Sequence, residues 1–188
     1  MKVQLVDPSA FTPPYDRSLA GALARAGVDV ELVTSRFRYG SVPPADGYEV
    51  NELFYRRAGG RRMLKLAEHV PDMLRYRSYA DKAELVHWQW LSVEQLDAWL
   101  LPPKRPRVLT AHNVIAHEGR PGQAAARRRL LRAMDAVIVH SAHGAEQAAR
   151  LGLVDAEVLA EVRELAASAL FRIVVITQGA LAPLRRTR

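Results

Sequence analysis

The chain has 188 residues, of which 49% are hydrophobic and 25% charged, a size and balance typical of one globular domain with a substantial core. It contains no cysteine, which excludes a disulfide scaffold, a thiolate metal site and a cysteine nucleophile. The net charge of +7, from 27 basic and 20 acidic residues, is consistent both with an anionic partner and with solubility alone.

The first half of the chain alternates between short apolar runs and helical patterns. They predict strands at residues 2–7, 29–35 and 48–56. Helices are predicted at 15–26 and 61–80, and a loop at 36–47. Gly27 marks the end of the first helix. In the long helix, apolar residues recur at steps of three and four from Met63 to Leu74, and Pro71 is expected to break it or to start a second helix.

The second half continues the alternation of strands and helices. Strands are expected at residues 84–90, 107–113, 136–141 and 172–177, and helices at 92–101, 121–134, 142–151 and 155–170. Buried strands that alternate with helices predict an α/β fold, namely a Rossmann-like, doubly wound, mostly parallel sheet with helices on both faces. Ligands of such sheets bind beyond the carboxyl ends of the strands, so the residues that follow each strand are the first candidates for a site.

The loop after the first strand, residues 7–16, contains no glycine. A dinucleotide fingerprint needs glycines there, and no P-loop pattern occurs elsewhere, so no cofactor is predicted. The loop either binds a ligand through Ser9, Thr12 or the start of the next helix, or is a rigid proline-rich connection.

Aromatic residues lie at the end of the fourth predicted strand. Trp88 and Trp90 either pack in the core or form a wall for a sugar or an apolar ligand, and Trp90, nearer the rim, is the better candidate for the wall.

Polar residues end the next two strands. His112, with Asn113 beside it, is well placed to transfer a proton or orient a hydroxyl. His117 follows five residues later, but this is no recognised ligand spacing and no metal is predicted. Ser141 is a natural N-cap for the helix after it, and its hydroxyl can also contact a ligand if the strand end is open.

Five segments in order carry a family resemblance. They are KVQLVDPSAFTPPYDRSLAGALARAGVDVELVTSR, ELVHWQWL, RVLTAHNV, RRRLLRAMDAVIVHSAHGAEQAARLG and RIVVITQGAL. Together they resemble the N-terminal, acceptor-binding domain of glycosyltransferase family 4, a family of retaining GT-B enzymes. The resemblance covers residues 1–152 well and 172–181 loosely.

The resemblance implies transfer of a sugar from a nucleotide-sugar donor to a sugar or lipid-linked acceptor. His112 matches the family histidine near the donor sugar and the acceptor, which implies a role in catalysis by positioning a hydroxyl or stabilising the transition state. The substrate-binding residues it suggests are Trp90, Asn113, Ser141, Ser9, Thr12 and Tyr15.

The chain also departs from the family pattern. Pro13-Pro14-Tyr15 replaces the glycine-rich loop, Thr177-Gln178-Gly179 replaces a Pro-His-Gly turn, and residues 152–188 form an atypical closing helix and strand. Residues 1–188 therefore predict one acceptor-side domain without its donor domain, inactive alone and able to bind a nucleotide sugar only with a second domain. A truncated or engineered stable domain without activity is the alternative. Self-association through the exposed docking face is also expected.

A membrane-surface binding module is a further alternative. Arg61, Arg62, Lys65 and Arg75 lie among leucines and methionines, a composition that suits either an anionic bilayer surface or a solvated helix face. No nucleic-acid-binding pattern occurs, so nucleic acid is not an expected partner. Without a signal peptide or a long apolar run, the expected location is cytoplasmic, with peripheral membrane attachment as a variant.

Overall fold

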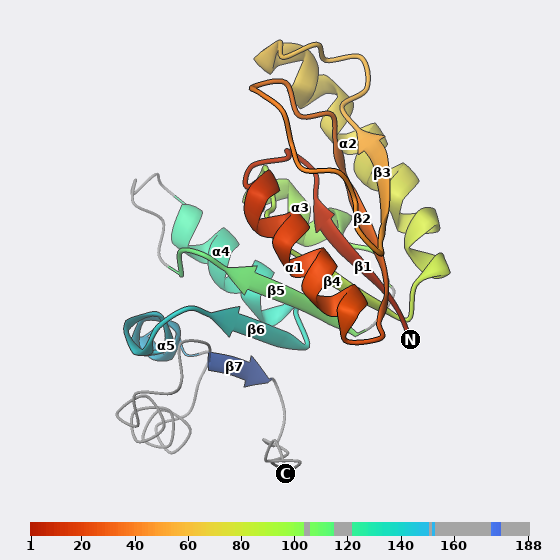
Figure 1. Ribbon diagram of the computed structural model, residues 1–188. Coiled ribbons are helices and arrows are strands. Elements are labelled where there is room, and N and C mark those ends of the chain that lie inside the picture. The colour runs from red at the N-terminus through yellow and green to blue at the C-terminus, as the bar shows by residue number, and fades with distance from the viewer. Residues whose placement is uncertain (104–105, 115–121, 151, 153–173, 178–188) are drawn as a thin grey trace.

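The computed structural model describes residues 1–103, 106–114, 122–150, 152 and 174–177 (Figure 1). The strands are β1 (Lys2–Asp7), β2 (Asp29–Ser35), β3 (Glu49–Phe54), β4 (Leu85–Trp88), β5 (Arg107–Ala111), β6 (Ala136–Val139) and β7 (Val174–Thr177). The helices are α1 (Pro13–Arg25), α2 (Arg62–Tyr79), the 3-10 turn η1 (Ala80–Lys82), α3 (Glu94–Leu100), α4 (Gln123–Arg132) and α5 (Ala142–Arg150).

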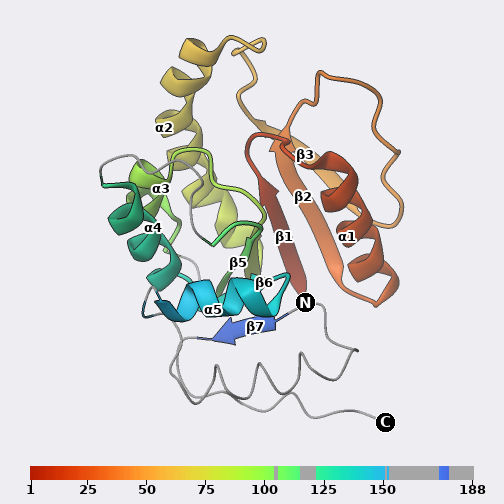
Figure 2. The same ribbon diagram turned by 90° about the vertical axis from the view of Figure 1, so that its left-hand side faces the viewer.

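The strands form one sheet in the order β3-β2-β1-β4-β5-β6-β7. The first six are parallel, and β7 pairs antiparallel with β6. Helix α1 covers one face, while α2, α3 and α4 cover the other (Figure 2). The predicted Rossmann-like, mostly parallel α/β fold is confirmed.

The core lies on the two faces of this sheet. Leu5, Val30 and Leu32 pack against α1, and a larger cluster around Trp88, Phe54 and other buried side chains fills the face beneath α2, α3 and α4. Trp88, the last residue of β4, is fully buried, so of the two indoles at this strand end it is the core residue.

Helix α2 differs from expectation in two ways. Pro71 lies inside one continuous helix, so the predicted break is wrong. Most of the apolar residues that predict this helix also face solvent, since Met63 is 77% exposed and Leu66 and Leu74 are about half exposed, whereas Met73 is buried. The buried face is instead formed by His69, Asp72, Met73 and Tyr76.

The end of the chain is described only in part. The helix predicted at residues 155–170 lies outside the described residues, and of the strand predicted at 172–177 the described part is β7. Within the described ranges, no helix is long and apolar enough to span a membrane.

Candidate functional site

Four neighbouring parallel strands end at the same edge of the sheet and bring five rings together. The rings belong to Phe11 after β1, Tyr15 in α1, Trp90 after β4, His112 after β5 and His140 after β6. His112 is central, because its ring stacks on Trp90 with 4.5 Å between centroids and 4° between planes. Tyr15 meets His112 edge-on at 5.2 Å. Phe11 packs on Trp90 at 4.5 Å yet stays 66% exposed, so the cluster opens to solvent.

The environment of His112 keeps its ring neutral. Burial, and then the neighbouring His140, lowers the pKa of His112 to about 4. Its Nδ1 lies 3.3 Å from His140 Nε2, and its buried Nε2 has no hydrogen-bond partner among the described residues. A neutral imidazole offers one N–H donor and one lone pair, which suits orientation of a hydroxyl better than binding of an anion.

The loop after β1 is shaped by the buried Asp7 carboxylate. Its oxygens accept hydrogen bonds from the backbone amides of Ser9, Phe11 and Thr12 at 3.1, 2.5 and 3.3 Å. Trp90 Nε1 then donates to Thr12 Oγ1 at 2.8 Å. Asp7 therefore holds the conformation of the loop, and this loop in turn places Thr12 against Trp90 of the ring cluster.

Asp7 is one of two carboxyl groups buried side by side beneath this loop. Burial, and then the charge of Asp7, raises the pKa of Asp16 to about 9. Thr12 Oγ1 lies 3.5 Å from Asp16 Oδ1. Asp16 therefore retains its proton at neutral pH, because two adjacent carboxylates cannot both ionise out of water.

Two other predicted residues lie at the margin of the cluster. The side chain of Asn113 is exposed, and its carbonyl accepts a hydrogen bond from Arg127, which also pairs with Glu94. Ser141 Oγ accepts a hydrogen bond from the Gly144 amide at 3.1 Å, as an N-cap of α5 does. The structure thus brings Thr12, Tyr15, Trp90 and His112 together and gives Ser141 its capping role.

A cleft of about 790 Å³ opens beside the ring cluster. Its walls come from the loop after β1, the segments around β3, the first half of α2 and the segment before α3, including Ser9, Phe11, Tyr55, Met63, Lys65, Leu66, His69, Trp90 and Ser92. The predicted residues Ser9 and Trp90 lie in this wall, and the hydroxyls of Ser9 and Ser92 are 2.5 Å apart.

Sequence reasoning missed a chain of polar side chains in the cleft wall. The Tyr55 hydroxyl lies 2.7 Å from His69 Nδ1, and His69 Nε2 lies 2.7 Å from Asp97 Oδ1. These residues are 14 and 28 positions apart, a spacing that forms no motif. The sequence does contain one signal for these residues. His69 and Asp72 are polar residues that share a face of the predicted helix with Met73 and Tyr76.

The basic residues of α2 divide between two environments. Arg61, Arg62 and Arg75 are exposed, although Arg75 pairs with Asp72 at 3.0 Å. Lys65 is half-buried, and its ammonium lies 4.7 Å from the centroid of the Tyr55 ring, in the wall of the cleft.

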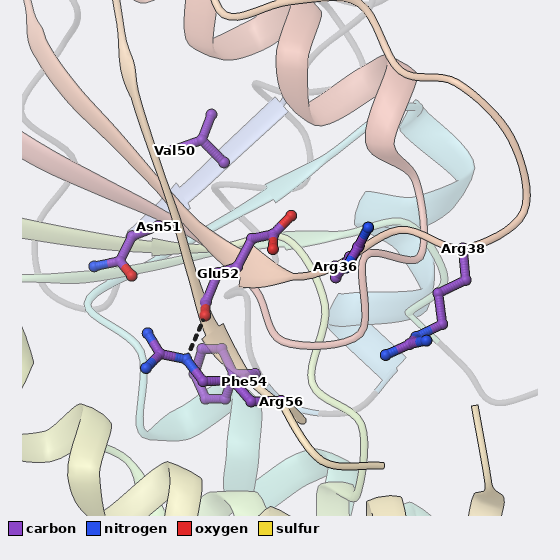
Figure 3. Close-up of a pocket in the computed structure, with 7 residues that line it drawn as sticks. All are labelled: Arg36, Arg38, Val50, Asn51, Glu52, Phe54 and Arg56. Carbon is purple, nitrogen blue, oxygen red and sulfur yellow. Dashed lines mark hydrogen bonds between the residues drawn. The ribbon is translucent and has the colours of Figure 1, made fainter. Parts of the chain in front are cut away.

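A second hollow, of about 560 Å³, lies along the outer strand β3 and was not predicted (Figure 3). Arg36 and Arg38 reach it from the segment after β2, and Arg56 from the segment after β3. Arg56 Nε donates to the Glu52 carbonyl at 2.7 Å. Three guanidinium groups give this hollow a basic rim, at the far edge of the sheet from β5 and β6.

Among the residues that the structure describes, no three histidine or carboxylate side chains gather as metal ligands would. His117 lies outside the described residues.

Comparison with known proteins gives a family and a fold. The sequence matches the model of Glycosyltransferase Family 4 over residues 16–160. Sucrose-phosphate synthase from Thermosynechococcus elongatus superposes with a TM-score of 0.55 at 18% identity, covering 80% of this chain and 45% of that one. UDP-GlcNAc 2-epimerase from Methanocaldococcus jannaschii gives a TM-score of 0.50 at 9% identity, covering 82% and 43%. At these identities the likeness shows the fold alone, and the chain spans less than half the length of either structure. No curated protein matches the sequence.

Proposed function

The chain belongs to glycosyltransferase family 4, and on that premise we propose that it forms the acceptor side of a retaining sugar-transfer site. The donor is a nucleotide sugar held by a second domain, and the acceptor bears a hydroxyl and lies against the ring cluster. The observation that carries this proposal is the position of His112, a neutral imidazole stacked on Trp90 at the carboxyl ends of the parallel strands.

The ring cluster suits a sugar acceptor for two reasons. The faces of Trp90 and Phe11 offer apolar surface of the kind that packs against the C–H groups of a sugar ring. The Nε2 atom of His112 is a polar group without a described partner, and a hydroxyl of the acceptor would satisfy it. The exposure of Phe11 suits a surface that a donor domain covers, or through which copies of this domain associate.

The isolated chain of 188 residues should not turn over sugar nucleotides. Its loop after β1 offers no glycine-rich backbone cradle for a diphosphate, so the donor contacts have to come from the other domain. Calorimetry with UDP-glucose and GDP-mannose should show no heat of binding for the chain alone, and binding once a donor domain is supplied. Micromolar binding of either nucleotide sugar by the chain alone would contradict this division of roles.

A second candidate function, attachment to an anionic membrane surface, is favoured by the exposed stripe of α2. Met63, Leu66 and Leu74 face solvent on the helix that also carries exposed Arg61 and Arg62. An amphipathic helix with apolar and cationic side chains on its outer side suits insertion among lipid headgroups. Arg75 and Lys65 belong to the same prediction, although Lys65 is half-buried with its ammonium over the Tyr55 ring.

Vesicle sedimentation tests this attachment. At low salt the chain should bind vesicles of phosphatidylcholine and phosphatidylglycerol, and lose most of that binding in high salt. The double variant Arg61→Glu/Arg62→Glu should bind at least about tenfold more weakly, since each surface cation contributes about 1 kcal/mol. Arg25→Glu on α1, which covers the other sheet face, is the matched control. Equal binding by all three proteins, or none at low salt, would rule the attachment out.

A further inference from the structure

The wall of the large cleft contains a hydrogen-bonded relay of Asp97, His69 and Tyr55. Asp97 and His69 are almost wholly buried, at 0% and 1% exposure, while Tyr55 lines the cleft. Asp97 is itself fixed, because its second oxygen accepts the Val93 amide at 2.7 Å. The side chains of Asp97 and His69 are thus held in the core behind the Tyr55 phenol.

The relay fixes the direction of its hydrogen bonds. Asp97 carboxylate can only accept, so His69 Nε2 is the protonated nitrogen. When the ring carries this one proton, Nδ1 has a lone pair and the Tyr55 hydroxyl donates to it. The phenol oxygen then has its lone pairs on the side of the cleft wall, where the hydroxyls of Ser92 and Ser9 interact with it. Burial raises the pKa of Tyr55 to about 12, so the phenol keeps that proton at neutral pH.

The backbone of the cleft wall is strained at the same place. Among the described residues, Ala10 and Tyr55 are the non-glycine residues with positive φ, at 48° and 51°, and both line the cleft. Such a conformation costs about 1–3 kcal/mol and persists only where the surroundings enforce it. At Tyr55 the enforcement is visible, since the buried Asp72 carboxylate accepts the Tyr55 amide at 2.7 Å.

Resting on the proposed sugar transfer, we propose that Tyr55 binds a hydroxyl of a neutral polyol or sugar acceptor in this cleft, with His69 and Asp97 as positioning residues. The phenol oxygen accepts the hydrogen bond of the acceptor hydroxyl. Ser9 and Ser92, whose hydroxyls lie 2.5 Å apart in the same wall, complete a polar floor. The exposed side chains of Met63, Leu66 and Phe11 add apolar surface to the cleft, beside the cationic Arg62 and Lys65.

Titration of the labelled chain with myo-inositol, a neutral polyol, tests the relay by NMR. We expect the Tyr55 ring and His69 nitrogen resonances to move with saturation, and Tyr55→Phe to raise the dissociation constant about tenfold. Tyr79→Phe is the matched control, because that hydroxyl bonds Asn51 and Glu31 rather than the relay. The nitrogen shifts of His69 in the free chain should show protonation at Nε2 and not at Nδ1.

The outcomes separate the relay from the wider proposal. If myo-inositol moves the His112 resonances but not those of Tyr55, or binds Tyr55→Phe as tightly as the parent, the relay proposal fails and acceptor binding stands. If it moves neither set, both fail. Should Tyr55→Phe not fold, Asp97→Asn replaces it, since asparagine keeps an acceptor oxygen without the charge. That variant should weaken inositol binding severalfold and shift the His69 nitrogens, and unchanged binding would overturn the relay.

Discussion

Replacing His112 with alanine should lower kcat/KM by about 100-fold or more in an enzyme that joins this domain to its donor domain. The His112 ring is neutral, stacked on Trp90 and without a described partner at its buried Nε2, so its loss removes a group placed to orient the reacting hydroxyl. The melting temperature should change little, because the ring is only half-buried and is stacked at the rim of the fold. Steady-state kinetics and thermal unfolding on the same preparations measure both quantities.

His143→Ala is the matched control for this substitution. His143 is an exposed histidine of α5 whose ring contacts Gln147 on the same helix. Its removal should leave kcat/KM within about twofold of the parent, as expected for a surface change away from the site. An active His112→Ala enzyme, or one whose activity falls only because it unfolds, would contradict the assigned role.

Asp16→Asn should stabilise the chain by on the order of 2 kcal/mol near pH 8. Asp16 has an ordinary pKa of 3.8 and one of about 9 in the fold. Between these values the folded chain holds a proton that the unfolded chain releases. The free energy of unfolding therefore falls as pH rises through this window, and the contribution of the proton is lost above pH 9.

An asparagine at this position has no proton to release and can still donate to Asp7, as the protonated carboxyl of Asp16 does. The stability difference between the two proteins should thus be small near pH 4 and grow toward pH 9, measured by denaturant unfolding at each pH. Asp46→Asn, at an exposed carboxyl, should show no such growth. A pH-independent difference for Asp16→Asn would mean that the carboxyl pair does not share a proton.

Apolar periodicity predicts most of this fold. The buried runs at residues 2–7 and 29–35 match β1 and β2, since a strand covered on both faces is apolar along its length. The rule that ligands bind at the carboxyl ends of parallel strands likewise predicts Trp90 and His112, which the structure stacks together.

Other features depend on packing between distant segments, which a local pattern does not contain. Helix α2 has the predicted length but buries His69 and Asp72, because each finds a partner, Asp97 and the Tyr55 amide, that is far away in sequence. Pro71 is tolerated because it lies on the exposed side of the helix. The carbonyl of the preceding turn that receives no amide from Pro71 can be hydrogen-bonded by water there. The relay of Tyr55, His69 and Asp97 could not be predicted from the sequence for the same reason, because its residues are far apart along the chain.

The mixed polar and apolar buried face of α2 also determines how this helix can vary among related sequences. An apolar helix face tolerates exchange of leucine for methionine or isoleucine one position at a time. A face fixed by directed hydrogen bonds does not, because a change at His69 leaves Asp97 and Tyr55 without their partner. Positions 55, 69 and 97 should therefore vary together or not at all, while position 74, exposed and outside the cleft wall, should vary more freely.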